Sequence, residues 1–462
     1  MRRSSIQNSN GTVFLPDAIS PRTLAVCRSL GRKGVYVTCA DESPFNLAFF
    51  SRYCQTRTTY PSPLHSPQKF VAHLLDYLSQ HPQDCLIPVK EESLDAILSH
   101  RDEFERLTHL PFPETSVFQL CRDKNKTMEL ANQLGIPHPQ TVLPSDLNQV
   151  KELSKSLRAP LVIKPRMSCS GLGIHYVEDI SDLYETYSQV HEQYPFPMIQ
   201  EEIPLGEKFD VACLMDENSR PLATFAQKEI RSFPLRDGAS TVQESVWRPD
   251  LVELTVQLLQ KMGWTGIAEA EFMVDPRDGT PKLLEVNPRF WGSLQLSIQS
   301  GVDFPYLLYQ WSRGERIQPV HEYKVGQFCR QILPYDLMHF VANPDRFKMS
   351  PSFFSAFAAN SGHNLFSSDD LGPLLGFFLS CSRYVFDPDK WLHLARMEKF
   401  ADQIGGLLHH NPKTVSSATL NGLVETNSME PLLLQGNKLG ISYAGIDPKE
   451  EDNRRKEELC IS

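Results

Sequence analysis

One stretch of the sequence decides the fold: residues 283–289, which read LLEVNPR. Side chains of a strand alternate between its two faces, so Glu285 and Asn287 point the same way, about 7 Å apart at their Cα atoms. Leu284 and Val286 take the opposite face, which we expect to be the core. The pattern predicts a strand with one polar and one buried face.

A second alternating run lies upstream at residues 266–274, which read GIAEAEFMV, and a segment rich in turn-forming residues, 275–280, separates the two runs. A hairpin centred near Asp278 would place Glu271 directly opposite Glu285. Opposed residues share a face, with Cβ atoms about 4.5–5.5 Å apart. The sequence therefore predicts two facing carboxylates.

Two facing carboxylates repel each other, and a divalent cation is the obvious compensation. Carboxylate and amide oxygens suit Mg²⁺ or Mn²⁺, and Mg²⁺ commonly takes few protein ligands together with phosphate oxygens. Glu271, Glu285 and Asn287 therefore predict a platform for magnesium and phosphate, on which Arg289 could hold a phosphoryl or carboxylate group. The alternative is a solvated sheet face with incidental acids.

A second feature is the segment 161–174, which reads LVIKPRMSCSGLGI. An apolar strand delivers Lys164, and a loop of small residues follows whose backbone N–H groups can crowd around an anion. The pattern G-x-x-x-x-G-K-[ST] is missing, so this is not a Walker A loop. We interpret it as a strand–loop–strand flap over a nucleotide; an ordinary hairpin with a surface lysine is the alternative.

A third feature is the segment 198–207, which reads MIQEEIPLGE. A strand that carries polar residues into a turn could offer backbone groups to an adenine edge and a carboxylate to a ribose. A strand that simply ends at an exposed turn is equally consistent with the sequence.

The first block, about residues 12–115, alternates between strand and helix patterns. Pro21 opens a helical pattern, residues 34–39 are β-branched and aromatic, and residues 70–78 have helical spacing. Such alternation predicts a parallel sheet with helices on its faces. The loop after the first strand lacks G-x-G-x-x-G, so it does not indicate a dinucleotide site.

The composition excludes several classes of protein. The chain has 462 residues, 41% hydrophobic and 22% charged, an ordinary globular mix for roughly two to four domains. An excess of 56 acidic over 46 basic residues argues against a dedicated nucleic-acid binder. No apolar run reaches the roughly 18–20 residues that span a bilayer, and residues 1–12 lack the apolar stretch of a signal peptide. Ten scattered cysteines without C-x-x-C spacing favour a reducing, cytoplasmic location.

The three features, in this order and at these separations, resemble the ATP-grasp superfamily over about residues 12–320. The most specific stretch is 285–293, which reads EVNPRFWGS. Asp123 and Lys124, before a helix that ends with LGIP at residues 134–137, also match. The resemblance is strongest to the carboligase branch that includes the large subunit of carbamoyl-phosphate synthetase and D-aspartate ligase.

The resemblance implies a fold of the α/β and α+β classes, in which a parallel-sheet pre-ATP-grasp domain precedes an ATP-grasp fold of two α+β subdomains. The implied boundaries are 1–115 for the pre-ATP-grasp domain, 116–190 for the small flap subdomain, 191–320 for the large subdomain with the metal site, 321–410 for a C-terminal extension and 411–462 for a polar tail.

The resemblance also implies roles for residues that match its motifs. The implied ATP-binding residues are Lys124 and Lys164 at the phosphates, Ser170, Gly171 and Gly173 in the flap, Glu201, Glu202 and Ile203 at the adenine, and Glu207 at the ribose. Lys208 or Asp210 could take the ribose position instead. Two Mg²⁺ (or Mn²⁺) ions would bind Glu271, Glu285 and Asn287. The implied catalytic residues are Arg289, Lys228 and Arg231, and for the last two an exposed strand charge is about as probable.

The implied activity is that of an ADP-forming ligase, which activates a small-molecule carboxylate as an acyl phosphate and joins it to an amine or similar nucleophile. We expect neither a nucleic-acid nor a membrane partner, and a homodimer is possible. A nucleotide-binding regulatory protein without turnover, or a phosphotransferase, would use the same site. No second ATP-grasp copy follows, which argues against synthesis of carbamoyl phosphate as such.

Overall fold

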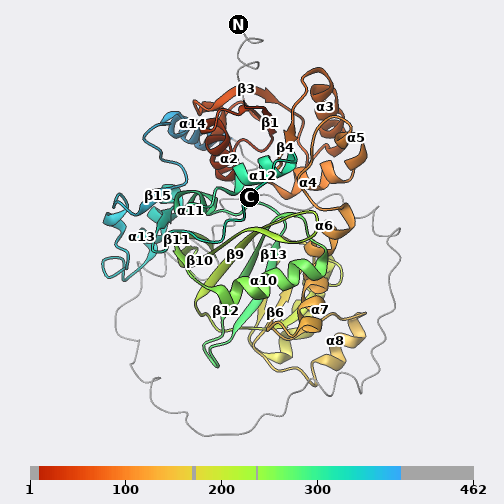
Figure 1. Cartoon of the computed structure of the whole chain (residues 1–462). Coiled ribbons are helices and arrows are strands. Elements are labelled where there is room, and N and C mark those ends of the chain that lie inside the picture. The colour runs from red at the N-terminus through yellow and green to blue at the C-terminus, as the bar shows by residue number, and fades with distance from the viewer. Residues whose placement is uncertain (1–9, 169–172, 236–237, 387–462) are drawn as a thin grey trace. The chain divides into compact units, whose positions relative to one another are not determined.

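The computed structural model describes residues 10–168, 173–235 and 238–386. The N-terminal domain is the predicted parallel sheet, with strand order β3-β2-β1-β4 (Figure 1). Its elements are β1 (Thr12–Leu15), α2 (Pro21–Arg32), β2 (Tyr36–Asp41), η1 (Ala48–Phe50), β3 (Cys54–Thr59), α3 (Pro67–Gln80), β4 (Cys85–Leu86), α4 (Glu91–Leu98) and α5 (Arg101–Glu105). Helix α2 begins at Pro21 as predicted, because Ser20 caps it by accepting a hydrogen bond from the backbone N–H of Arg22.

The small subdomain is built on a four-stranded sheet with the order β5-β8-β6-β7. Its elements are α6 (Thr115–Arg122), α7 (Lys124–Leu134), β5 (Thr141–Val142), α8 (Leu147–Leu153), β6 (Leu161–Lys164), β7 (His175–Val177), η2 (Ile180–Asp182), α9 (Leu183–Gln193) and β8 (Met198–Glu201). Strands β6 and β7 pair antiparallel, which confirms the predicted strand–loop–strand arrangement. Helix α7 starts at an Asp123 cap and stops at Gly135 in the left-handed region, as its sequence predicts.

The large subdomain is built on a seven-stranded sheet with the order β13-β12-β9-β10-β11-β14-β15. Its elements are β9 (Lys208–Met215), β10 (Pro221–Phe233), β11 (Ala239–Val246), α10 (Pro249–Met262), β12 (Gly266–Val274), β13 (Pro281–Asn287), α11 (Leu294–Ser300) and α12 (Phe304–Ser312). Strands β12 and β13 form the predicted hairpin, with Glu271 opposite Glu285. Figure 1 shows α10 packed across one face of this sheet.

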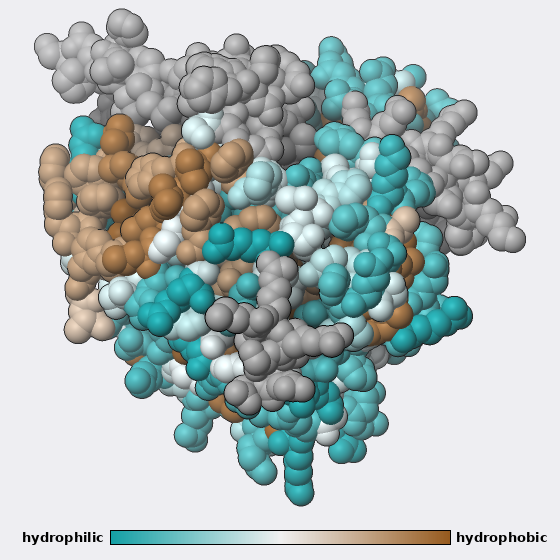
Figure 2. Space-filling view, turned by 90° about the horizontal axis from the view of Figure 1, so that it is seen from above, coloured by the Kyte–Doolittle hydropathy of each residue, from teal (hydrophilic) through white to brown (hydrophobic). Residues whose placement is uncertain are grey.

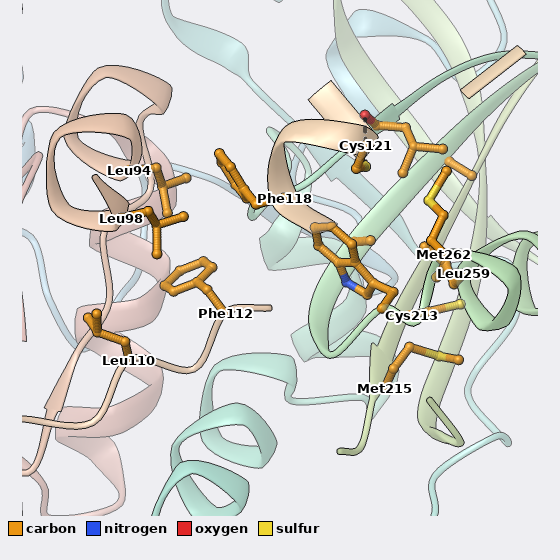
Figure 3. Close-up of a cluster of buried hydrophobic side chains, with 14 of the residues drawn as sticks. Leu94, Leu98, Leu110, Phe112, Phe118, Cys121, Cys213, Met215, Leu259 and Met262 are labelled. Carbon is orange, nitrogen blue, oxygen red and sulfur yellow. Dashed lines mark hydrogen bonds between the residues drawn. The ribbon is translucent and has the colours of Figure 1, made fainter. Parts of the chain in front are cut away.

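A continuous apolar core fixes the N-terminal domain to the large sheet. Leu94 and Leu98 of α4 and Phe118 of α6 belong to the same buried cluster as Met215 of β9 and Leu259 of α10 (Figure 3). Because one core spans these elements, the N-terminal domain packs against one face of the large sheet, and a second buried cluster, which includes Leu15, Leu214 and Ile267, joins it to the face that carries the polar residues described below.

Residues 321–386 extend the large sheet. The elements are β14 (Phe328–Arg330), η3 (Ile332–Asp336), α13 (Leu337–Ala342), η4 (Phe353–Ser355), β15 (Ser361–His363) and α14 (Gly372–Phe386). Strand β14 pairs with β11, and β15 pairs with β14. The predicted polar tail, 411–462, and the end of the predicted extension lie outside the described residues.

Large apolar side chains are exposed in and beside α14, namely Leu371, Leu375 and Phe378. Figure 2 shows an apolar area on the left of its view, the side on which α14 lies in Figure 1. Among the described residues, no helix has the length and apolar character that crossing a bilayer requires.

Candidate active site

A row of polar side chains crosses one face of the large sheet. Glu285 of β13 lies opposite Glu271 of β12, Glu271 lies opposite Asp210 of β9, and Asp210 lies opposite Gln227 of β10. Directly opposed residues of antiparallel strands share a face. The sequence predicted the first pair, and the structure extends that pair by two strands.

Two more carboxylates join this face. Glu269 is two residues from Glu271 on the same strand and lies opposite Asn287. Glu229 is two residues from Gln227 on β10. We call Asp210, Glu229, Glu269, Glu271 and Glu285 the acidic face. Five carboxylates on one face of one sheet give a concentration of negative charge that a structural role does not require.

Neutral amides bridge the members of this face. The Nδ2 of Asn287 donates to Oε1 of Glu271 at 2.6 Å and to Oε2 of Glu269 at 3.3 Å. The Nε2 of Gln227 donates to Oδ2 of Asp210 at 2.8 Å. These bonds orient the carboxyl groups without adding a charge, because an amide donor is neutral.

Four of the five carboxylates of the acidic face have raised pKa values. Burial, reinforced by Glu285 and Asp210, raises the pKa of Glu271 to about 8. Burial and the neighbouring Glu229 raise the pKa of Asp210 to about 8, and burial raises the pKa of Glu229 to about 7. The pKa of Glu269 is raised well above its usual range by burial next to Asp210 and Glu271. Each shift has the sign that mutual repulsion in a poorly solvated site produces.

Two lysines of the small subdomain reach this face. The Nζ of Lys124 lies 3.2 Å from Oε2 of Glu285 and also donates to the carbonyl oxygen of Ser168. Burial alone would raise the pKa of Glu285, but Lys124 and Lys164 outweigh it and lower that pKa. Burial lowers the pKa of Lys164, against the attraction of Glu285 and Glu271. The two lysines and the paired carboxylates therefore form one electrostatic site.

The donor set fits magnesium and a polyphosphate better than a protein-only metal cage. Among the described residues, no three His, Cys, Asp or Glu side chains converge closely enough to hold a metal ion by themselves. Carboxylate and amide oxygens that leave positions for phosphate oxygens are the usual surroundings of Mg²⁺. Glu271, Glu285 and Asn287 supply such oxygens, and the lysines supply counter-charges for phosphates.

The flap residues are described only in part. Gly173 has φ +74°, and a Cβ there would come within 2.6 Å of the Pro165 side chain, so glycine is required at this position. Ser170 and Gly171 lie outside the described residues. Their assignment to the phosphates stays a prediction.

The predicted adenine and ribose residues lie between the end of β8 in the small subdomain and the start of β9 in the large subdomain. The carboxylate of Glu201 accepts from Lys282 at 2.9 Å and from Arg277 at 3.3 Å, and its backbone N–H donates to the carbonyl oxygen of Gln140 at 2.9 Å, so both groups already have partners within the protein. Ile203 is buried, and Glu202 next to it is half-buried. Glu207 is exposed and pairs with Lys228.

Two of the predicted catalytic cations are not brought to the acidic face. Side chains alternate along β10, so Gln227 and Glu229 take that face, and Lys228, opposite Phe209, takes the other. Arg231 is buried and pairs with Asp336 of the C-terminal extension at 2.8 Å. The prediction rested on the charges in QKEIR, residues 227–231, without knowledge of which face each occupies, and the assignment of both residues to catalysis stays a prediction.

Arg289 does lie beside the acidic face, two residues after Asn287. Its Nε contacts Oε1 of Glu91, from α4 of the N-terminal domain, at 3.1 Å. Glu91 was not predicted, because no local pattern indicates a contact across 198 residues of chain. Asp210 and Glu229 were missed as members of the acidic face, although the alternation in residues 208–210 and 227–229 carried the signal.

A flap subdomain that presents lysines to an acidic sheet defines the ATP-grasp class of fold. A family model described as ATP-grasp in the biosynthetic pathway with Ter operon matches residues 222–331. A biotin carboxylase–β-γ-ATP complex from Campylobacter jejuni aligns with a TM-score of 0.58 at 15% identity, over 68% of this chain and 74% of that chain. That likeness is one of fold.

Curated relatives agree with this class. A D-alanine–D-alanine ligase from Pseudomonas fluorescens (strain Pf0-1) is 27% identical over 36% of this chain and 53% of its own length. A D-aspartate ligase from Enterococcus faecium (strain Aus0004) is 23% identical over 46% and 55%, respectively. The C-terminal section of a carbamoyl phosphate synthase large chain from Methanopyrus kandleri is 20% identical over 47% and 39%. The chain spans about half the length of the first two. Its fold is of the ATP-grasp class, and residues 222–331 are similar to an ATP-grasp family model.

Proposed function

We propose that this protein is an ATP-dependent, ADP-forming ligase that activates a carboxylate as an acyl phosphate and joins it to an amine. The observation that carries the proposal is the acidic face itself, where Glu271 opposes Glu285 within reach of Lys124 and Lys164. A pair of facing, half-buried carboxylates lowers stability unless a cation neutralises it, so its presence favours a metal–nucleotide site.

In this proposal the residues act by position and charge. Glu271, Glu285 and Asn287 would hold two Mg²⁺ (or Mn²⁺) ions, which when bound neutralise phosphate charge. Lys124 would exchange its contact with Glu285 for a phosphate oxygen. The work left to the protein is in-line positioning and exclusion of water from a reactive acyl phosphate.

The activities for which the relatives are named support a ligase of small molecules. D-alanine–D-alanine ligase and D-aspartate ligase are named for joining amino acids. We propose that the substrates here are likewise a small carboxylic acid and a small amine. A homodimer, expected from the sequence, stays a prediction.

A screen of ADP and phosphate release tests the proposal. The full chain is incubated with MgATP and pairs of small acids and amines, and products are identified by mass spectrometry. The expected result is release that requires both substrates and yields a condensed product. A phosphorylated product would indicate a phosphotransferase, and tight nucleotide binding without release for any pair would indicate a regulatory protein; either result contradicts the proposal. The variant Glu253→Gln, on the exposed side of α10, serves as the control for Glu285→Gln.

A further inference from the structure

Two arginines from different domains meet at one carbonyl oxygen beside the acidic face. Arg22, at the start of α2, donates from NH1 to the carbonyl oxygen of Phe290 at 3.4 Å. Arg289 donates from its own NH1 to the same oxygen at 3.3 Å. Two guanidinium groups, one from the N-terminal domain and one from the large subdomain, therefore surround a single acceptor.

Of the three acids near this pair, Glu91 and Asp17 are used elsewhere, and burial raises the pKa of the third, Glu92, to about 7. Glu91 contacts Arg289 with one oxygen and Arg122 with the other, at 3.1 and 3.2 Å. Asp17 accepts from the backbone N–H groups of Val89 and Lys90 and from the hydroxyl of Ser93.

Arg22 itself has no partner of opposite charge. Among the described residues, no carboxylate lies within 4.0 Å of its guanidinium. Its second contact is another long bond, from NH1 to the carbonyl oxygen of Val89 at 3.4 Å. Arg22 therefore makes no ion pair among the described residues, and Glu91, Asp17 and Glu92 attract it only from farther away.

Helix α2 also carries an arginine that does form an ion pair. Arg28 is buried, its Nε contacts Asp370 at 2.9 Å, and its NH2 donates to the carbonyl oxygens of Leu365 and Asp370 at 2.9 Å. Arg22 has only the two long bonds and stays half-buried, hence reachable. Burial, reinforced by the neighbouring Arg289, lowers the pKa of Arg22 to about 10. A guanidinium in this position is stabilised by an incoming anion.

We propose that Arg22 and Arg289 form a two-arginine cradle that binds the carboxylate of the acid substrate beside the phosphoryl-transfer site. The inference rests on the proposed function for the identity of the ligand. Arg289 lies two residues from Asn287, so an anion in this cradle lies next to the predicted magnesium platform. Planar guanidinium groups match a carboxylate in shape and offer it paired N–H donors. The N-terminal domain thus contributes a substrate-binding residue.

Isothermal titration of the full-length chain with sodium malonate, at constant ionic strength, tests the cradle. We expect saturable binding to the wild type and a dissociation constant at least about tenfold higher in Arg22→Gln. Lys33→Gln removes one charge from the exposed end of α2 and is expected to bind malonate within about twofold of the wild type. Arg22→Lys keeps the charge without the planar fork and is expected to fall between Arg22→Gln and the wild type.

The two proposals can fail separately. A titration with MgADP is run on the same samples, and Arg22→Gln is expected to match the wild type. Failure of the wild type to bind MgADP would contradict the proposed function while leaving the malonate result readable. Non-saturable malonate binding by the wild type, or equal malonate affinity in the wild type and Arg22→Gln, would overturn the cradle. If Arg22→Gln does not fold, the comparison of Arg22→Lys with Lys33→Gln decides the question.

Discussion

The acidic face and the contact between α2 and the C-terminal extension use the same kinds of residue in opposite ways. At the contact, Arg28 and Asp370 are both almost fully buried, and the carboxylate also accepts from the hydroxyl of Ser51 at 2.7 Å. On the acidic face, five carboxylates have three nearby lysines, Lys124, Lys164 and Lys208, and four of the five have raised pKa values.

The difference separates charges that build the fold from charges that await a ligand. A buried ion pair whose groups are all hydrogen-bonded needs no further partner, so its role is structural. A cluster of like-charged groups lowers the stability of the fold, and a bound cation together with phosphates would remove that repulsion. Charged groups that lack an ion-pair partner, rather than the number of charged residues in an element, therefore indicate function.

The largest expected effect is a loss of stability when the ion pair between Arg28 and Asp370 is broken. Arg28→Ala leaves Asp370 buried without its counter-charge, so we expect the free energy of unfolding to fall by about 3–5 kcal/mol. Urea denaturation measures the change. The double variant Arg28→Ala/Asp370→Ala should lose less than the sum of the single losses. A loss below about 1 kcal/mol for Arg28→Ala would mean that the contact does not stabilise the fold.

The next effect is on turnover at the acidic face. Glu285→Gln and Asn287→Asp should lower phosphate release by about 10²–10³-fold, the usual cost of removing one group that stabilises transferring charge. Their unfolding midpoints should stay close to that of Glu253→Gln. Activity that declines only in proportion to the unfolded fraction would remove the functional distinction between the two regions.

A smaller effect concerns pH. Asp210 and Glu271 have folded pKa values of about 8, and Glu229 of about 7, against about 4 in an unfolded chain. Between those limits the folded chain binds more protons than the unfolded chain, so the free energy of unfolding falls as pH rises. Each such proton contributes a slope of up to about 1.4 kcal/mol per pH unit.

Urea denaturation at pH 5 to 8, with and without MgADP, measures this slope. MgADP should flatten it, because a bound cation stabilises the charged carboxylates. If the free energy of unfolding instead rises with pH in the ligand-free protein, the carboxylates of the acidic face are already charged and paired with positive groups of the protein.

The smallest effect is expected for Glu269→Gln. Because the pKa of Glu269 is raised well above its usual range, its neutral acid form is the one that an amide of the same shape replaces. We expect a change in the free energy of unfolding of less than about 0.5 kcal/mol at pH 7. A loss of several kcal/mol would show that Glu269 is charged and internally compensated.

Local sequence patterns predicted those features that depend on strand alternation and on turn-forming residues. The hairpin of β12 and β13, the facing Glu271 and Glu285 and the Gly135 stop of α7 all follow from residues near one another in sequence. The partners of Arg231 and Arg289 did not, because Asp336 and Glu91 lie about a hundred residues or more away along the chain. Contacts at such separation depend on how the domains dock, which alternation does not encode.

The central claim is that the acidic face binds a divalent cation together with a nucleotide. Electron paramagnetic resonance of Mn²⁺ titrated into the protein with ADP tests it most directly, because bound Mn²⁺ loses the sharp signal of the free ion. The account predicts Mn²⁺ uptake beyond that of ADP alone for the wild type and Glu253→Gln, and a large loss of this uptake in Glu285→Gln. Equal uptake by Glu285→Gln and the wild type would contradict it.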